Sequence, residues 1–386
     1  MEIEQFLLRI NKQWRERQPF VVYKKPDDLF LKGLFQQNET LYTSSDFSES
    51  GFIFAPFDSN KPSVLIPLKE AELFSLEVDR QELLNNEFAL HHEFDNWNNP
   101  RASDKQSHII RVQNAINAIE DQQFSKVVIS RKETLSAEGK NPVEIFISLL
   151  HHYPNAFIYL WYHPQVGMWL GATPETLLKI SGNQLKTMAL AGTQNFEGSE
   201  NVVWRTKEKE EQQIVTDFIV DQLRRSLNNK SSVNDLIKVS EPRTIKAGNL
   251  LHLQTEISLR LPSQSKNLKP ILDALHPTPA VCGFPKEIAK KYILEHEGYN
   301  RSFYSGFLGE LNFKEVTTRN PNRRNVENNA YNIPKPVSNL YVNLRCMEFI
   351  EESVSLFVGG GITKDSDPVS EWEETVHKSK IIKKVL

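Results

Sequence analysis

The sequence contains few cysteines, and this scarcity narrows the classes of protein that it can encode. Cys282 and Cys346 are the only two cysteines in 386 residues. Two thiols cannot form a disulfide framework, nor can they supply the usual four ligands of a cysteine-based zinc site. We therefore expect a protein that is stabilised by an ordinary hydrophobic core rather than by disulfides or zinc. The low cysteine content fits a reducing compartment, and we expect a cytoplasmic location.

The sequence also lacks an excess of charge of one sign and any long apolar run. The 46 Lys and Arg residues nearly balance the 49 Asp and Glu residues, which gives a formal net charge of −3. This balance provides no bulk attraction to nucleic acid. There is no run of roughly 18 apolar residues, and residues 1–17 mix charges with short apolar pairs, so neither a membrane span nor a secretory signal is predicted. We expect a soluble monomer that binds neither nucleic acid nor membranes.

The order of the predicted elements indicates an α+β fold. Residues 1–100 hold short apolar runs separated by turn residues, which predicts strands and turns. The spacing further on predicts helices over 109–119, 142–152, 201–226, 285–296 and from about Asp367, strands over 126–131, 156–163, 167–170, 184–191 and 251–261, and a hairpin over 339–349 and 353–359. Polar residues 314–339 predict an exposed loop between two strands, and the length alone permits one or two domains.

Two predicted helices each carry a pair of glutamates three residues apart. The pairs are Glu208 with Glu211, and Glu371 with Glu374. This spacing places both carboxylates of a pair on one helical face. If the two helices converge, the four carboxylates repel one another unless a hard divalent cation neutralises them, and Mg²⁺ prefers such oxygen ligands. The alternative is that both segments are solvated, charge-rich helix faces, which are common.

Lys126 begins an otherwise apolar strand and is a candidate general base. Alternation places Lys126 on the same side as Val128 and Ser130. A lysine that faces a desolvated site has a lowered pKa and can take a proton from water. The alternative is a strand-end lysine whose long side chain reaches solvent.

Glu175 follows Gly171-Ala-Thr-Pro174, where glycine and proline interrupt a strand. We expect this carboxyl group at the opening of a short helical turn. In a partly apolar pocket it can stay protonated and act as a general acid, although a plain acid at a helix start is the commoner use.

Four further residues are candidate ligand contacts. Gly192 and Thr193 end a strand where backbone N–H groups can approach an anion. His276 stands before a proline-bounded turn that fixes its ring, and Arg345 lies on a strand where it suits a carboxylate. Each has an ordinary structural alternative: a tight turn, a structural histidine or a buried ion pair. The remaining histidines form no recognisable metal pattern.

The order of these motifs along the chain is more specific than any one of them. They resemble, in sequence, the chorismate-utilising family that includes the isochorismate, salicylate, anthranilate and aminodeoxychorismate synthases. The matching segments are Lys126–Arg131, Gly171–Glu175, Leu190–Thr193, Lys207–Asp217, His276–Val281, Leu344–Cys346 and Gly359–Lys378. They cover residues 105–386, whereas residues 1–100 match only in general character. Within the family, Lys126, Leu-Ala-Gly-Thr193 and His276-Pro-Thr-Pro-Ala-Val281 resemble the isochorismate synthases.

Three positions depart from the family pattern. Gln194 stands where arginine is usual, Gln212 where histidine is usual, and Cys282 where glycine is common. The departures bear on the roles of single residues more than on the family resemblance.

The resemblance implies a fold and a set of roles. The fold is one large α+β domain over residues 1–386, with two stacked antiparallel sheets covered by outer helices. The implied reaction is a reversible isomerisation of chorismate to isochorismate, in which Lys126 activates water and Glu175 protonates the departing hydroxyl group. The resemblance assigns Mg²⁺ to Glu211 and Glu374, with Glu208 and Glu371 assisting. It assigns chorismate binding to Gly192, Thr193, His276, Tyr304, Arg345, Gly360, Gly361 and Lys378.

Three alternatives remain open on the sequence. A salicylate synthase also makes isochorismate but then eliminates pyruvate. A catalytically idle chorismate-binding relative would need neither Lys126 nor Glu175. An unrelated phosphate-handling enzyme is disfavoured because no glycine-rich phosphate loop is present. The sequence also does not distinguish a quinone pathway from a siderophore pathway.

Overall fold

The computed structural model describes residues 3–78, 102–227, 236–247, 250–261, 267–315 and 335–386. Most of the predicted loop over 314–339 lies outside these residues. Both of its ends were predicted wrongly, because Lys314 and Glu315 end one strand and residues from Lys335 onward form another.

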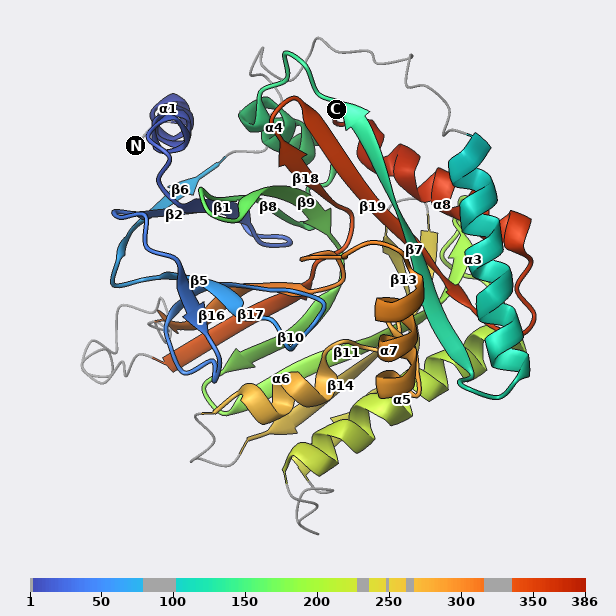
Figure 1. Ribbon diagram of the computed structural model, residues 1–386. Helices are drawn as coiled ribbons and strands as arrows, with labels where there is room; N and C mark the ends of the chain where they lie inside the picture. The colour runs from blue at the N-terminus through green and yellow to red at the C-terminus, as the bar shows by residue number, and fades with distance from the viewer. Residues whose placement is uncertain (1–2, 79–101, 228–235, 248–249, 262–266, 316–334) are drawn as a thin grey trace.

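Two large antiparallel sheets form the body of the molecule (Figure 1). Sheet A has the strand order β15 (Gly283–Phe284), β7 (Lys126–Ser136), β19 (Ser353–Ile362), β18 (Cys346–Ile350), β9 (Gly167–Thr173), β8 (Phe157–His163), β1 (Phe20–Lys24), β2 (Phe30–Gln36), β6 (Ala71–Glu77). Sheet B has the order β12 (Ile237–Val239), β14 (Leu250–Arg260), β11 (Gln184–Asn195), β10 (Thr176–Ser181), β17 (Lys335–Val342), β16 (Phe307–Glu315), β4 (Gly51–Ala55), β5 (Ser63–Pro67), β3 (Tyr42–Ser44), and β13 (Arg243–Ala247) also pairs with β14. The expected α+β architecture with two antiparallel sheets is confirmed.

Aromatic side chains fill the space between the sheets. Trp161 and Trp169 of sheet A and Phe54 of sheet B are fully buried in one cluster. The Phe54 ring stacks on Phe303, with 4.1 Å between the ring centroids. Large flat rings of this kind bury much apolar area, so they hold the two sheets face to face.

Helices cover the outer faces of the two sheets (Figure 1). Sheet A is covered by α1 (Ile3–Arg15) and α4 (Pro142–His152), and sheet B by α5 (Thr206–Ser226) and α6 (Lys269–Leu275). The helices α3 (Ala102–Glu120), α7 (Lys286–His296) and α8 (Pro368–Lys383) lie beside β7 and β19. The helix starts predicted from Pro142 and Pro368 are confirmed, each with a capping side chain before the proline. The N-terminal helix α1 was not predicted.

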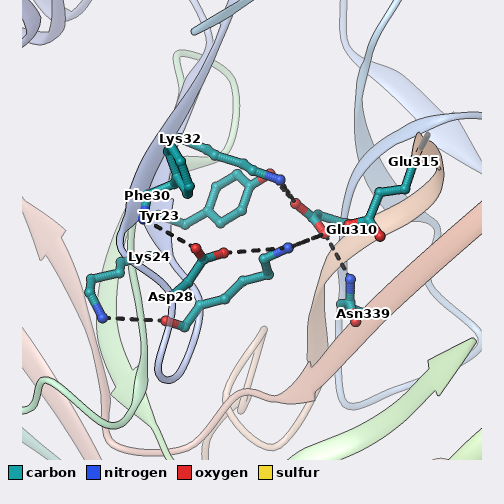
Figure 2. A network of polar contacts seen from close by, with 9 residues as sticks. Tyr23, Lys24, Asp28, Phe30, Lys32, Glu310, Glu315 and Asn339 are labelled. Atoms are coloured by element: carbon teal, nitrogen blue, oxygen red, sulfur yellow. Dashed lines mark hydrogen bonds and ion pairs between the residues drawn. The ribbon is translucent and has the colours of Figure 1, made fainter. Parts of the chain in front are cut away.

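A buried polar network also joins the sheets (Figure 2). The Glu310 carboxylate on β16 accepts hydrogen bonds from Tyr23 Oη at 2.9 Å, Lys32 Nζ at 2.8 Å and Asn339 Nδ2 at 2.8 Å. Lys25 Nζ lies 3.3 Å from the same carboxylate. Burial alone would raise the pKa of Glu310, but the two lysines outweigh it and hold this pKa below its ordinary value. The buried negative charge of Glu310 is therefore compensated by two lysines and two further hydrogen-bond donors.

The chain crosses between the sheets at two adjacent places that matter for the site. Only Pro174 and Glu175 separate β9 in sheet A from β10 in sheet B, and Asn343 to Arg345 separate β17 in sheet B from β18 in sheet A. Three expectations were therefore wrong. Glu175 does not open a helical turn, and Arg345 lies in a connection rather than on a strand. The residues over 339–342 pair in sheet B rather than in the β18–β19 hairpin.

The two crossings are hydrogen-bonded to each other. The Val342 N–H donates to the Glu175 carbonyl at 3.0 Å, and the Ala172 N–H donates to the Arg345 carbonyl at 3.1 Å. Buried Asn343 receives a hydrogen bond from Tyr159 Oη at 2.7 Å and donates to the Phe303 carbonyl at 2.9 Å. Glu175 and Arg345 consequently belong to one rigid unit between the sheets.

Candidate active site

Lys126 lies at one end of β7, next to the glycine run of β19. A Cβ atom added to Gly361 would lie 3.0 Å from Lys126 Cε, so the missing side chain leaves the space that the lysine occupies. Burial lowers the pKa of Lys126; Glu211 opposes this effect, Lys378 adds to it, and Glu371 opposes it. Lys126 therefore lies near charged side chains from both α5 and α8.

The helix α8 contributes three charged groups beside the same glycine run. Lys378 Nζ donates to the Gly359 carbonyl at 2.9 Å and forms an ion pair with Glu374 Oε1 at 2.5 Å. Glu371 Oε2 lies 3.0 Å from the position that a Cβ atom on Gly360 would take. Side chains at Gly360 and Gly361 would thus obstruct Glu371 and Lys126, so the glycines keep this side of the site open.

The helix α5 approaches β11 at Gly192. A Cβ atom there would lie 3.1 Å from Glu208 Cβ and 3.2 Å from the Glu208 carbonyl oxygen. Gly192 thereby permits close packing of the helix that carries Glu208 and Glu211. Oε2 of Glu208 is buried and, among the described residues, has no hydrogen-bond partner.

The carboxylates of α5 and α8 face a common region without forming a closed metal centre. Among the described residues, no three carboxylate, imidazole or thiolate side chains gather closely enough to ligate one ion. Glu211 and Glu371 nevertheless both act on Lys126, and the buried Glu208 oxygen lacks a donor. An all-oxygen set that leaves coordination positions for water and substrate suits a hard cation such as Mg²⁺.

Arg345 faces the same region from the second crossing. Its backbone has φ of 49°, and burial lowers the pKa of its guanidinium, whereas Tyr304, Tyr153 and Glu374 favour the charged form. The Tyr304 ring stacks on Phe357 with 5.5 Å between centroids, and burial raises the pKa of Tyr304 to about 12. A guanidinium and a phenol hydroxyl group thus lie near each other on this side of the region.

Glu175 is half-buried on the first crossing. Burial raises the pKa of its carboxyl group from 4.5 to about 7. The group is therefore about half protonated at pH 7, and the protonated form is the one that a general acid requires.

His252 also belongs to this site and was not recognised in the sequence. It lies on β14 opposite Thr193, and its ring hydrogen-bonds to the backbone of Gly192. Burial, followed by Arg345, lowers the pKa of His252 to about 4, so the ring is neutral at pH 7. The sequence could not indicate that His252 lies beside Gly192 and Thr193, because that neighbourhood depends on the pairing of β14 with β11, which are far apart in the sequence.

For the side chains of two predicted residues, His276 and Thr193, the described structure shows no contact with the groups above. His276 is buried with its ring 5.0 Å from that of Phe307, and it borders a cavity of about 300 Å³ beside α6. Within the described part of the chain, its ring nitrogens have no hydrogen-bond partner, and the charged groups that affect its pKa are Lys286 and Lys290 rather than Lys126. The backbone of Thr193 lies in β11, but its side chain is outside the described set. Substrate contact by either residue stays a prediction.

Comparison with known proteins identifies the family. A family model described as "chorismate binding enzyme" matches residues 69–317, and a second model with that description matches residues 335–384. The first match alone exceeds half of the chain. The chain belongs to the chorismate-binding enzymes.

Among curated relatives of this chorismate-binding enzyme are isochorismate synthases. Isochorismate synthase EntC of Escherichia coli is 29% identical over 66% of this chain and 60% of its own length. The salicylate biosynthesis isochorismate synthase of Pseudomonas aeruginosa is 28% identical over 72% of this chain and 54% of its own. The chain thus spans just over half the length of these relatives. MenF, the menaquinone-specific isochorismate synthase of Escherichia coli, has the same fold, with a TM-score of 0.70, 20% identity, and coverage of 95% of this chain and 88% of its own.

Proposed function

We propose that this protein is an isochorismate synthase that converts chorismate to isochorismate with the help of Mg²⁺. The observations that carry the proposal concern Lys126 and Glu175. Burial lowers the pKa of Lys126, which lies against Gly361, and raises the pKa of Glu175, which lies where the chain crosses between the sheets. A base and an acid of this kind are what hydroxyl exchange on a ring requires.

The proton movements balance between these two groups. Lys126 takes a proton from a water molecule as the water oxygen bonds to one ring carbon. The ring double bonds shift, and the hydroxyl group on another ring carbon leaves with the proton of Glu175 as a second water molecule. Lys126 and Glu175 then exchange protons with solvent to restore the starting state, so no oxidant or other reactant is needed.

The remaining charged groups orient a substrate with two carboxylates. The guanidinium of Arg345 suits the enolpyruvyl carboxylate, because a planar fork binds a carboxylate with two hydrogen bonds. Tyr304 and His252 lie near enough to Arg345 to interact with it electrostatically. Lys378 is tied to the Gly359 carbonyl and keeps the glycine run in place beside the ring.

Glu211 and Glu374 would hold Mg²⁺, with Glu208 and Glu371 assisting. A bound Mg²⁺ supplies positive charge that offsets both the glutamates and the ring carboxylate. The buried Glu208 oxygen supports this assignment, because an ionised oxygen removed from water needs a cation or a donor.

The test is product identification after incubation of the purified protein with chorismate and Mg²⁺. We expect isochorismate without added ammonia. The Lys126→Ala variant should form isochorismate far more slowly in the same assay. Lys132→Ala is its matched control and should keep wild-type activity, since Lys132 is an exposed lysine on the same strand. Anthranilate or aminodeoxychorismate as the main product would contradict the proposal. Salicylate and pyruvate formed at the same rate as isochorismate would instead identify a salicylate synthase.

The relatives do not fix the pathway, because their names include salicylate and menaquinone biosynthesis. We propose that isochorismate feeds one of these two classes of pathway, and that the enzymes encoded beside this one decide which.

A further inference from the structure

Gln212 departs from the family pattern, and the proposed reaction gives its side chain no role. It follows Glu211 on α5 and is 1% exposed. Its side-chain amide makes three hydrogen bonds to sheet B. Nε2 donates to the Ala189 carbonyl at 3.0 Å and to Thr255 Oγ1 at 2.9 Å, and Oε1 accepts from the Ala191 N–H at 2.9 Å. Two strands and one helix therefore meet at a single side chain.

These hydrogen bonds lie where β11 departs from regular pairing. The register of β11 with β14 is interrupted between Leu190 and Thr193, where three steps on β11 correspond to two on β14. Such a bulge disrupts the ladder and re-aims the backbone beside it. Gln212 binds the Ala191 N–H within this bulge, and the next residue is Gly192, whose backbone hydrogen-bonds to His252.

The same hydrogen bonds restrict how α5 sits on the sheet. Glu208 and Gln212 are four residues apart and so lie on one stripe of the helix, with Glu211 at its margin. Contact of Glu208 with Gly192 limits how closely the helix approaches, and the three bonds of Gln212 limit its slide and rotation. Glu208 and Glu211 are thereby held in place from one side.

We propose that Gln212 is a positioning residue that locks α5 to the β11 bulge, and so fixes the carboxylates of Glu208 and Glu211 together with the Gly192 backbone. The effect on Mg²⁺ binding and turnover rests on the proposed function. The attachment of α5 to the bulge does not. A glutamine suits the place because it offers two donors and one acceptor. The neutral histidine that is usual there in the family offers one of each and can satisfy two of the three groups.

The test compares Gln212→Leu, Gln212→His and Gln213→Leu. Leucine has a similar size but makes none of the three hydrogen bonds. Gln213 is the matched control, since it is exposed on the same helix and its side chain donates a hydrogen bond to Asp217 on that helix rather than to sheet B. The measurements are amide hydrogen exchange at Ala191, Mg²⁺ affinity by calorimetry, and kinetics at pH 8, where the introduced imidazole is neutral.

We expect Gln212→Leu to expose the Ala191 amide to faster exchange and to weaken Mg²⁺ affinity by about 10–100-fold, the usual effect of losing a group that orients a metal ligand. At saturating Mg²⁺ the KM for chorismate should move much less than kcat. Gln212→His should recover part of both losses, and Gln213→Leu should match the wild type. Recovery by histidine separates positioning from a general loss of packing.

Unchanged Ala191 exchange together with unchanged Mg²⁺ affinity in Gln212→Leu would overturn the inference. If that variant does not fold, Gln212→Met is measured instead, because methionine keeps the length of the side chain without its amide, and unchanged Ala191 exchange together with unchanged Mg²⁺ affinity there overturns the inference equally. If the proposed function is wrong, the wild-type protein will not convert chorismate. The exchange measurement at Ala191 still tests the role of Gln212 in that case.

Discussion

Replacing Glu175 by glutamine should stabilise the protein, and by an amount that depends on pH. Burial raises the pKa of this carboxyl group from 4.5 to about 7. Below pH 4.5 the group is protonated in both the folded and the unfolded state and contributes nothing. As the pH rises from 4.5 to 7, the unfolded state ionises first and unfolding is favoured increasingly; above pH 7 the penalty is constant. A shift of this size corresponds to about 3 kcal/mol at pH 8 and less than about 1 kcal/mol at pH 5.

Glutamine keeps the shape of the protonated acid and cannot ionise, so Glu175→Gln removes the penalty. With an unfolding entropy of about 2.1 cal/mol/K per residue, the substitution should raise Tm by about 4 °C at pH 8 and by about 1 °C at pH 5. The assay is calorimetry without Mg²⁺ or chorismate, with Glu373→Gln on the exposed face of α8 as the control for loss of one charge. An equal Tm change at the two pH values, or none at pH 8, would refute the reasoning.

Further predictions concern activity. Lys126→Ala should lower kcat by about 10²–10⁴-fold with a much smaller change in KM, because it removes proton transfer and not binding, and near-normal kcat in a folded variant would exclude the role of base. Arg345→Ala should raise the KM for chorismate about tenfold or more, since a charge-assisted hydrogen bond to a carboxylate is lost, and steady-state kinetics check this. Excess EDTA should abolish turnover, and Glu208→Gln should increase the Mg²⁺ concentration needed for half-maximal rate by about tenfold; full activity in EDTA would refute the metal assignment. Gly192→Ala should displace α5 and lower activity, since the new Cβ atom lies 3.1 Å from Glu208 Cβ, and a crystal structure of the variant would show the shift.

Local signals in the sequence predicted the elements whose ends are set by nearby residues. The helix over 142–152 is found with those bounds, because Asn141 caps it and Pro142 suits its first turn. The final helix starts at Pro368 for the same reason. Glycine and proline before Glu175 correctly indicated a break in the strand. They could not indicate that the chain crosses to the other sheet there, because that depends on the pairing of β10 with β17.

The sequence named candidate site residues but not how they are arranged. Glu211 and Glu371 lie near enough to Lys126 to raise its pKa, although the three residues come from three elements spread over most of the chain. Their catalytic and metal-binding roles stay predictions. His252 was missed because its importance comes from its pairing with Thr193 across a bulge. Gln212 was noted only as a departure, and its role depends on backbone groups of β11 that the sequence does not place. Long-range strand pairing supplied what local patterns could not.

The central claim is that Lys126 delivers a hydroxyl group from solvent to the ring while Glu175 releases another. The most direct measurement is turnover of chorismate in water labelled with heavy oxygen, followed by mass spectrometry of the product. We predict isochorismate with one labelled oxygen, located at the new hydroxyl position, and at least about 100-fold less labelled product from Lys126→Ala over the same time. Isochorismate without label would show that the hydroxyl group moves within the substrate, and would contradict the roles given to both residues.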